Sequence, residues 1–176
     1  TYLDLMNKAR DKVKDAFELS KQEGWESVKD KEKVQLWKKS QEGSSINILK
    51  KYMEVNTTKE NVIKSFKDSD FIKKINDKVK ENEVIEEINE NIRLVRREMK
   101  GNLVVSNRDI AFFMYQIPLT DGSIVLVMFS IEDDKIPEVK KVVRAQMDIA
   151  FLHAKPLSES STAVLSVIKL DPKGSI

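Results

Sequence analysis

Cysteine is absent from this chain of 176 residues, and histidine occurs once, as His153. Without cysteine the chain has no disulfide, no thiolate zinc site and no thiol nucleophile. A single histidine also excludes metal motifs built on a histidine pair and weakens the case for general-base catalysis. We therefore expect no metal, no cofactor and no enzymatic activity, and the absence of cysteine favours the reducing cytoplasm as the location.

Strong net charge and long apolar runs are missing as well. The 31 Lys and Arg residues nearly balance the 29 Asp and Glu residues, and a net charge of +2 provides no field that would attract nucleic acid. Hydrophobic residues make up 40% of the chain, too many for a disordered segment, yet no run is long enough to span a bilayer. The length predicts a single domain over residues 1–176 and leaves the oligomeric state open.

Helical periodicity is clearest in the opening segment. It predicts a helix over residues 1–23 that ends at Gly24. Thr57 and Glu60 have the spacing of a capping box and predict a second helix, and Asp68 begins a shorter third one. The apolar positions that fall on one face of the first helix are Tyr2, Leu5, Met6, Ala9, Val13, Ala16, Phe17 and Ser20.

Segments rich in β-branched and aromatic residues predict the strands. They are 25–29, 34–39, 46–55, 79–88, 92–100, 109–117, 123–131, 142–152 and 162–170. Turn residues at 89–91 and 120–122 predict hairpins, which make the sheet antiparallel. The order α-βββ-αα-ββββββ is that of an α+β fold in which helices pack on one curved sheet.

The later strands are unusually apolar. Segment 109–117 has large apolar residues on both faces, and strict alternation in 142–152 places Ala145, Met147 and Ile149 on one inward face. A curved sheet with such side chains encloses either a packed core or a ligand cavity, and periodicity does not distinguish them.

Several motifs together resemble those of one family. They are Trp25, the stretches 42–46 and 84–88, Ser106 to Asp109 at the start of a strand, 142–145, and the terminal sequence 171–176. In this order and at these spacings they resemble the StAR-related lipid transfer (START) domain over about residues 25–176.

The resemblance implies a helix-grip fold. In this fold a curved sheet, here 25–170 with two inserted helices, forms an apolar groove for one lipid beneath a C-terminal lid helix. The family's lid begins just after the signature at 171–176, so we expect this chain to contain its start and to lack the lid itself. The loop 132–141 corresponds to part of the family's gate, and a solvated turn is the alternative.

Family comparison and strand alternation together predict which residues line the cavity. They are Leu94, Ile110, Phe112, Met114, Leu126, Met128, Ala145, Met147 and Ile149. The sterol-binding members carry a basic and an acidic side chain in the cavity. The basic position is Met114 here, and the acidic position is Leu94 or Val95. Met147 stands where those members carry a polar ring. The resemblance therefore implies a phospholipid or fatty acid ligand in preference to a sterol.

The predicted function is the binding of one lipid for non-vesicular transfer or sensing, with transient contact at a membrane surface. The alternatives are a cyclase-like or hydrolase-like enzyme of the same fold, and a regulatory ligand-sensing module of a larger protein.

Two polar features are interpreted as structural. Arg93, Arg96, Arg97 and Lys100 either contact anionic headgroups or solubilise a strand, and we expect the second. His153 is predicted at the end of a strand, in an exposed or edge position, and no Ser or Asp motif accompanies it.

Overall fold

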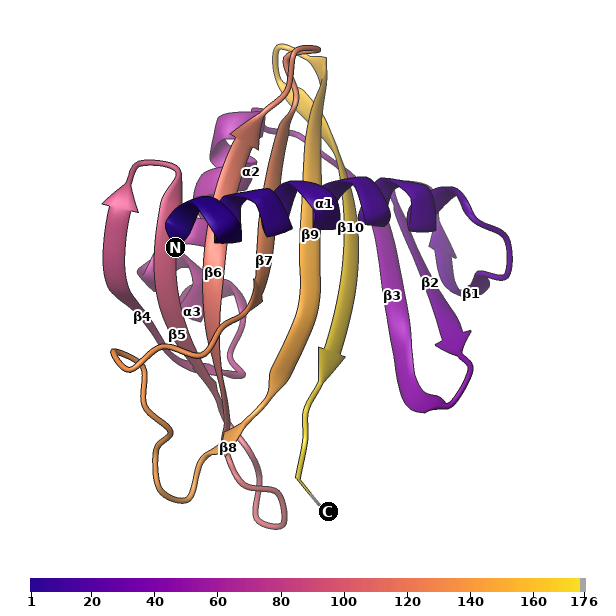
Figure 1. Ribbon diagram of the computed structural model, residues 1–176. Helices are drawn as coiled ribbons and strands as arrows, with labels where there is room; N and C mark the ends of the chain where they lie inside the picture. The colour runs from indigo at the N-terminus through magenta and orange to yellow at the C-terminus, as the bar shows by residue number, and fades with distance from the viewer. Residues whose placement is uncertain (175–176) are drawn as a thin grey trace.

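The computed structural model describes residues 1–174 and contains three helices on a ten-stranded sheet (Figure 1). The helices are α1 (Tyr2–Lys21), α2 (Lys59–Lys67) and α3 (Ser69–Ile75). The strands are β1 (Glu26–Lys31), β2 (Val34–Gln41), β3 (Ser44–Val55), β4 (Val79–Asn89), β5 (Ile92–Met99), β6 (Arg108–Pro118), β7 (Ile124–Ser130), β8 (Val143–Arg144), β9 (Gln146–Ser158) and β10 (Ser161–Asp171).

The sheet is a curved antiparallel layer with the order β1-β2-β3-β10-β9-β7-β6-β5-β4. Hairpins connect most neighbours, as predicted, and β10 joins β3 to close the two halves of the chain into one sheet. The short strand β8 pairs in parallel with the start of β6. The predicted α+β class is confirmed.

Helix α1 lies across one face of the sheet, over β6, β7 and β9 (Figure 1). Thr1 caps its first turn, because the Thr1 hydroxyl and the Asp4 carboxylate each accept a backbone N–H of the other residue. Ala9 and Ala16 are buried, so the predicted apolar stripe is confirmed. Their small side chains allow the helix to approach the strands closely.

Helices α2 and α3 lie on the opposite face (Figure 1). Thr58, not Thr57, is the N-cap of α2, and its hydroxyl accepts a hydrogen bond from the Asn61 backbone N–H. The capping box predicted from Thr57 and Glu60 was therefore wrong: Thr57 precedes the N-cap, and its hydroxyl accepts a hydrogen bond from the Asn61 side-chain amide. Asp68 caps α3 as predicted.

Two apolar clusters form the core. The first lies under α1, and we call it the helix-1 cluster: Ala9, Ala16, Ile48, Ile92, Leu94, Ala111, Phe113, Tyr115, Val125, Val127, Phe129, Ile136, Ile149, Phe151 and Val167. The second includes the buried face of α2, and we call it the methionine cluster: Val62, Ile63, Val95, Ile110, Phe112, Met114, Ile124, Leu126, Met128, Ala145, Met147, Ala150, Leu152, Ala154 and Val164.

The predicted strand 142–152 is wrong in its bounds. It divides into β8 and β9 around Ala145, and β9 continues to Ser158. At the C-terminus, Asp171 still belongs to β10 and 172–174 are not helical, while the remainder of the predicted lid start, 175–176, lies outside the described residues. None of the helices within residues 1–174 is long and apolar enough to cross a membrane.

Candidate functional site

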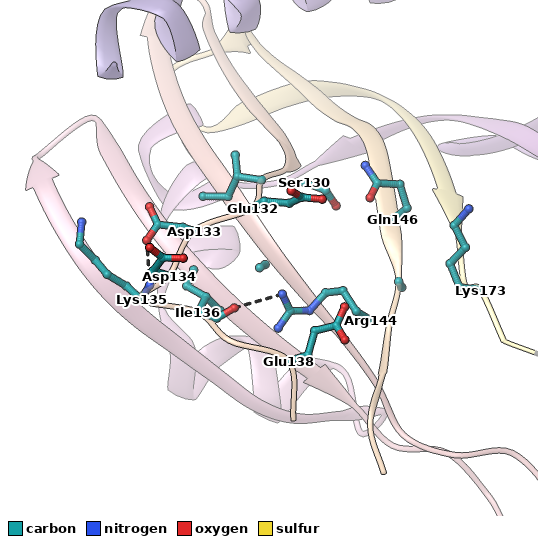
Figure 2. A pocket seen from close by; sticks show the side chains of 13 residues that line it. Ser130, Glu132, Asp133, Asp134, Lys135, Ile136, Glu138, Arg144, Gln146 and Lys173 are labelled. Carbon is teal, nitrogen blue, oxygen red and sulfur yellow. Dashed lines mark hydrogen bonds between the residues drawn. The ribbon is translucent and has the colours of Figure 1, made fainter. Parts of the chain in front are cut away.

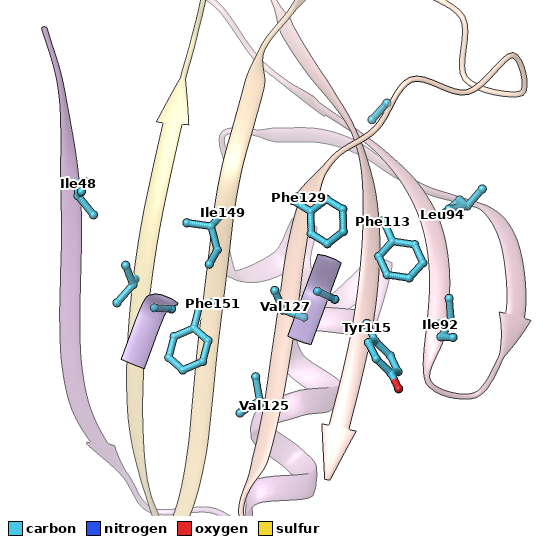
Figure 3. Close-up of a cluster of buried hydrophobic side chains, with 14 of the residues drawn as sticks. Ile48, Ile92, Leu94, Phe113, Tyr115, Val125, Val127, Phe129, Ile149 and Phe151 are labelled. Carbon is cyan, nitrogen blue, oxygen red and sulfur yellow. The ribbon is translucent and has the colours of Figure 1, made fainter. Parts of the chain in front are cut away.

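The residues predicted to line a cavity fall on both faces of the sheet. All are buried. All but Leu94 and Ile149 belong to the methionine cluster, whereas those two lie in the helix-1 cluster with Phe113, Phe129 and Phe151 (Figure 3). Their role as lipid contacts stays a prediction.

A β-bulge explains why Ile149 and Met147 lie on different faces. Along the β9–β10 ladder Leu170 pairs with Met147, but the next residue, Lys169, pairs with Ile149. Asp148 is therefore an extra residue, and it inverts the alternation that the sequence suggested. On β5 the pairing of Val95 with Phe112 places Val95, not Leu94, on the face of Met114.

The methionine cluster borders an apolar pocket of about 520 Å³ between β3 and the helices α2 and α3. Its apolar wall residues are Met53, Val55, Val62, Phe66, Phe71 and Ile75. Met53, Val55 and Phe66 also pack against the methionine cluster, so the pocket and the cluster are continuous. Phe71 and Ile75 are 42% and 60% exposed, which makes the α3 wall an apolar surface open to water.

A larger hollow of about 830 Å³ lies beside the loop 132–141, and its walls are mainly polar (Figure 2). Lys135 Nζ donates to Glu86 Oε2 at 2.7 Å, and Arg144 donates to the Ile136 and Pro137 carbonyl oxygens. Ile136 is buried in the helix-1 cluster. The loop is therefore anchored and is not a freely solvated turn. Because hydrocarbon gains little from polar walls, we place the candidate lipid site at the smaller, apolar pocket.

The arginines of β5 differ from the predicted solubilising role. Arg96 Nε donates to the fully buried Asp109 at 2.7 Å, and Arg144 Nε donates to the same carboxylate at 2.7 Å. The next residue, Arg97, is on the other face, where its Cζ lies 5.3 Å from the ring centroid of Phe112. Burial lowers the pKa of the Arg97 guanidinium to about 10, so it remains charged at neutral pH.

His153 has partners that the sequence did not reveal. Its Nε2 lies 2.8 Å from Ser123 Oγ, and the Ser123 hydroxyl donates to Asp121. Burial is the main cause that lowers the pKa of His153. The prediction of an exposed strand end was wrong, because β9 continues past His153 and Phe17 of α1 covers its ring. Ser123 stands between the other two groups, so His153 is not oriented by the carboxylate as in a hydrolase triad.

Comparisons with known proteins agree with this geometry. The START domain family model matches residues 7–176. None of the curated proteins compared with the chain matches it.

Solved structures show the same fold at low identity. Human StAR-related lipid transfer protein 5 has a TM-score of 0.86 and 17% identity, covering 97% of this chain and 84% of its own. Human STARD10 has a TM-score of 0.83 and 20% identity, covering 93% of this chain and 68% of its own. A Streptomyces aromatase/cyclase, Zhui, has a TM-score of 0.50 and 13% identity, covering 74% of this chain and 71% of its own. The match over almost the whole chain, on a helix-grip fold, means that the chain belongs to the START domain family.

Proposed function

We propose that this protein binds one lipid at the methionine cluster and carries it between membranes or reports its presence. The observation that carries the proposal is the apolar pocket of about 520 Å³, continuous with a buried cluster, in a chain of the START family. Its volume falls within the range of about 300–1,000 Å³ that small-molecule sites occupy.

The energetic reason is the cost of exposing hydrocarbon to water. Each buried methylene contributes about 0.8 kcal/mol, so a sixteen-carbon chain costs about 13 kcal/mol to expose. An apolar cavity lowers that cost during transfer.

Flexible side chains let the cluster accept such a chain. Met114 and Met128 face each other on paired strands, and Met147 belongs to the same cluster. All three side chains are buried, so a lipid that enters the cluster has to displace them from their present packing. Methionine is unbranched and polarizable, and it repacks around an inserted chain at lower cost than a branched or aromatic residue.

The ligand class follows from the side chains at these positions. Met114, Val95 and Met147 offer a sterol hydroxyl no charged partner. A phospholipid or fatty acid is therefore the proposed ligand, taken up during transient contact with a membrane surface, in a cytoplasmic protein. Competition between these lipids and cholesterol for one fluorescent probe tests the preference, and displacement of the probe by cholesterol at the lowest concentration contradicts it.

The enzymatic alternative needs a group that exchanges protons near neutral pH beside the ligand. Among the described residues that line the apolar pocket, the carboxylate is that of Asp68, and its oxygen accepts the Phe71 backbone N–H as the N-cap of α3. Arg97 and its partner Asn82, beside Phe112, are not general bases at neutral pH. Lipid binding without chemistry is therefore the function that this site supports best.

The test is transfer of a fluorescent lipid between donor and acceptor vesicles. We expect Met114→Trp to abolish transfer while cooperative unfolding persists, because the added ring fills space that the lipid needs. Met6→Trp is the matched control, since Met6 packs against the helix-1 cluster, and it should leave transfer unchanged. Normal transfer by folded Met114→Trp protein would contradict the proposal.

A further inference from the structure

Strand β5 sends two consecutive arginines to opposite faces of the sheet. Arg96 pairs with Asp109 and Glu98 on the α1 face. Arg97 is opposite Ile110 in the β5–β6 ladder and reaches over Phe112, both members of the methionine cluster. On this strand Arg96 pairs with carboxylates on one side of the sheet, whereas Arg97 lies over an aromatic ring on the other side.

Within residues 1–174, Arg97 has no carboxylate partner. Its Nε donates to Asn82 Oδ1 at 2.7 Å, and the Asn82 amide in turn donates to Ser69 Oγ at 2.9 Å. The terminal nitrogens of Arg97 donate to none of the described residues, and neither is sealed from solvent. By contrast, Arg93, Arg96 and Arg144 each pair with a carboxylate.

The surroundings make this arrangement costly for an isolated protein. Burial removes part of the water from around the guanidinium, and neither Asn82 nor Ser69 carries a compensating negative charge. Asn82 and Ser69 instead orient the guanidinium, because Nε is fixed while the terminal nitrogens keep free N–H donors. A planar guanidinium with free donors is suited to bind a carboxylate or phosphate with two parallel hydrogen bonds.

The Arg97 guanidinium is linked through Asn82 to helix α3, which forms one wall of the proposed lipid site. Ser69 is the first residue of α3, and Phe71 and Ile75 of that helix form one wall of the apolar pocket. Phe112 beneath the guanidinium belongs to the same cluster as the methionines. A ligand with an anionic end and a hydrocarbon tail would therefore meet complementary groups at both ends.

We infer that Arg97 is an internal anion site that receives the oxyanion of the lipid's polar end, a carboxylate or a phosphate, while the hydrocarbon lies against the methionine cluster. This inference rests on the proposed lipid-binding function and adds the selection of anionic over neutral lipids. Asn82 and Ser69 are positioning residues that hold the guanidinium.

The experiment compares lipid pairs with the same hydrocarbon chains, in which one member has an anionic polar end and the other a neutral one. Palmitate is set against methyl palmitate, and phosphatidic acid against diacylglycerol, each displacing one neutral fluorescent lipid from the purified protein. We expect wild-type protein to bind the anionic member about tenfold to a hundredfold more tightly, the size expected for charge-assisted hydrogen bonds. Tighter binding of the anionic member in the palmitate pair alone identifies a carboxylate as the group that Arg97 receives. Tighter binding of phosphatidic acid than of diacylglycerol identifies a phosphate.

Arg97→Met should remove this discrimination and leave binding of the neutral members within about twofold. Lys100→Met is the control, because Lys100 is an exposed cation just beyond β5, and it should retain the discrimination. Arg97→Lys keeps the positive charge and should retain part of the preference. If Arg97→Met does not fold, the wild-type comparison of palmitate with methyl palmitate still shows whether the protein prefers the anionic lipid.

Equal binding of charged and neutral members by wild-type protein overturns the inference and leaves the proposed function intact. Discrimination that persists in folded Arg97→Met protein overturns it as well. Failure of the wild-type protein to bind any of these lipids instead overturns the proposed function itself.

Discussion

The two faces of the sheet are both apolar, but they differ in what covers them and in how their charges are neutralised. On the α1 face a helix of 20 residues covers aromatic side chains, and a buried carboxylate neutralises two arginines. On the other face the short helices α2 and α3 border methionines, an apolar pocket and an arginine that has no counter-ion among residues 1–174.

The difference separates a structural core from a candidate binding surface. Aromatic rings such as Phe113 and Phe129 pack at 5.4 Å between centroids and resist rearrangement. Methionines at the paired positions Met114 and Met128 adapt to an inserted chain. Both faces come from the same strands, so alternate residues of β6 and β7 serve different purposes.

The largest expected effect contrasts the two kinds of arginine. Asp109→Asn should lower the free energy of unfolding by about 3–5 kcal/mol, because it leaves the half-buried Arg96 and Arg144 with reduced compensation. Arg97→Met should cost little or raise stability, since it removes a charge that no carboxylate of the described residues pairs with. Urea denaturation of both variants measures this, and equal destabilisation would contradict the contrast between the faces.

The second-largest expected effect contrasts Met147 and Ile149, which lie on either side of the extra residue Asp148. Ile149→Trp should destabilise by about 1–3 kcal/mol because it overpacks the helix-1 cluster, and lipid binding by the folded fraction should persist. Met147→Trp should have the opposite profile, with lost lipid binding and a smaller change in stability. Thermal unfolding measures the stability of each variant, and binding of a fluorescent lipid probe measures its lipid binding. If both variants lose only stability, both faces are packed core.

Acidification should weaken the α1 face specifically. Burial holds the pKa of His153 below its ordinary value, so the native protein binds fewer protons than the unfolded chain when pH falls below about 6.5. The contribution of neutral His153 to stability is thus present above that pH and lost as pH falls through the lowered pKa. Urea midpoints at stepped pH should show this loss, and His153→Gln should reduce it. An unchanged slope in that variant would assign the pH dependence to other groups.

The smallest expected effect concerns the loop 132–141. Lys135 lowers the pKa of Glu86 through a hydrogen bond, with help from the Tyr2 hydroxyl, and so ties the loop to β4. If this loop gates the groove, Lys135→Met should raise the rate of lipid exchange about twofold to fivefold at unchanged affinity, since an exposed ion pair contributes little to stability. Stopped-flow exchange measures it, and an unchanged rate would remove the gate role.

The order of helices and strands was predictable from local patterns, and so was the family. Apolar periodicity identified α1, and hairpin turns identified most strand pairs. The face assigned to Ile149 was not predictable, because one extra residue, Asp148, inverts the alternation without a signal in the sequence. Two further features depend on which strands lie side by side in the sheet. Arg97 has no carboxylate partner among residues 1–174, and Ser123 contacts His153. No local pattern of charges in the sequence distinguishes Arg97 from the paired Arg96.

The most direct test of the central claim is nuclear magnetic resonance of protein labelled with carbon-13 in its methionine methyl groups, titrated with a spin-labelled fatty acid. Met114, Met128 and Met147 report on the methionine cluster, and Met6 reports on the α1 face. We predict that the signals of the first three broaden at one equivalent of lipid while the signal of Met6 stays sharp. Broadening of Met6 alone, or of none of them at saturating lipid, would contradict the assignment of lipid binding to the methionine cluster.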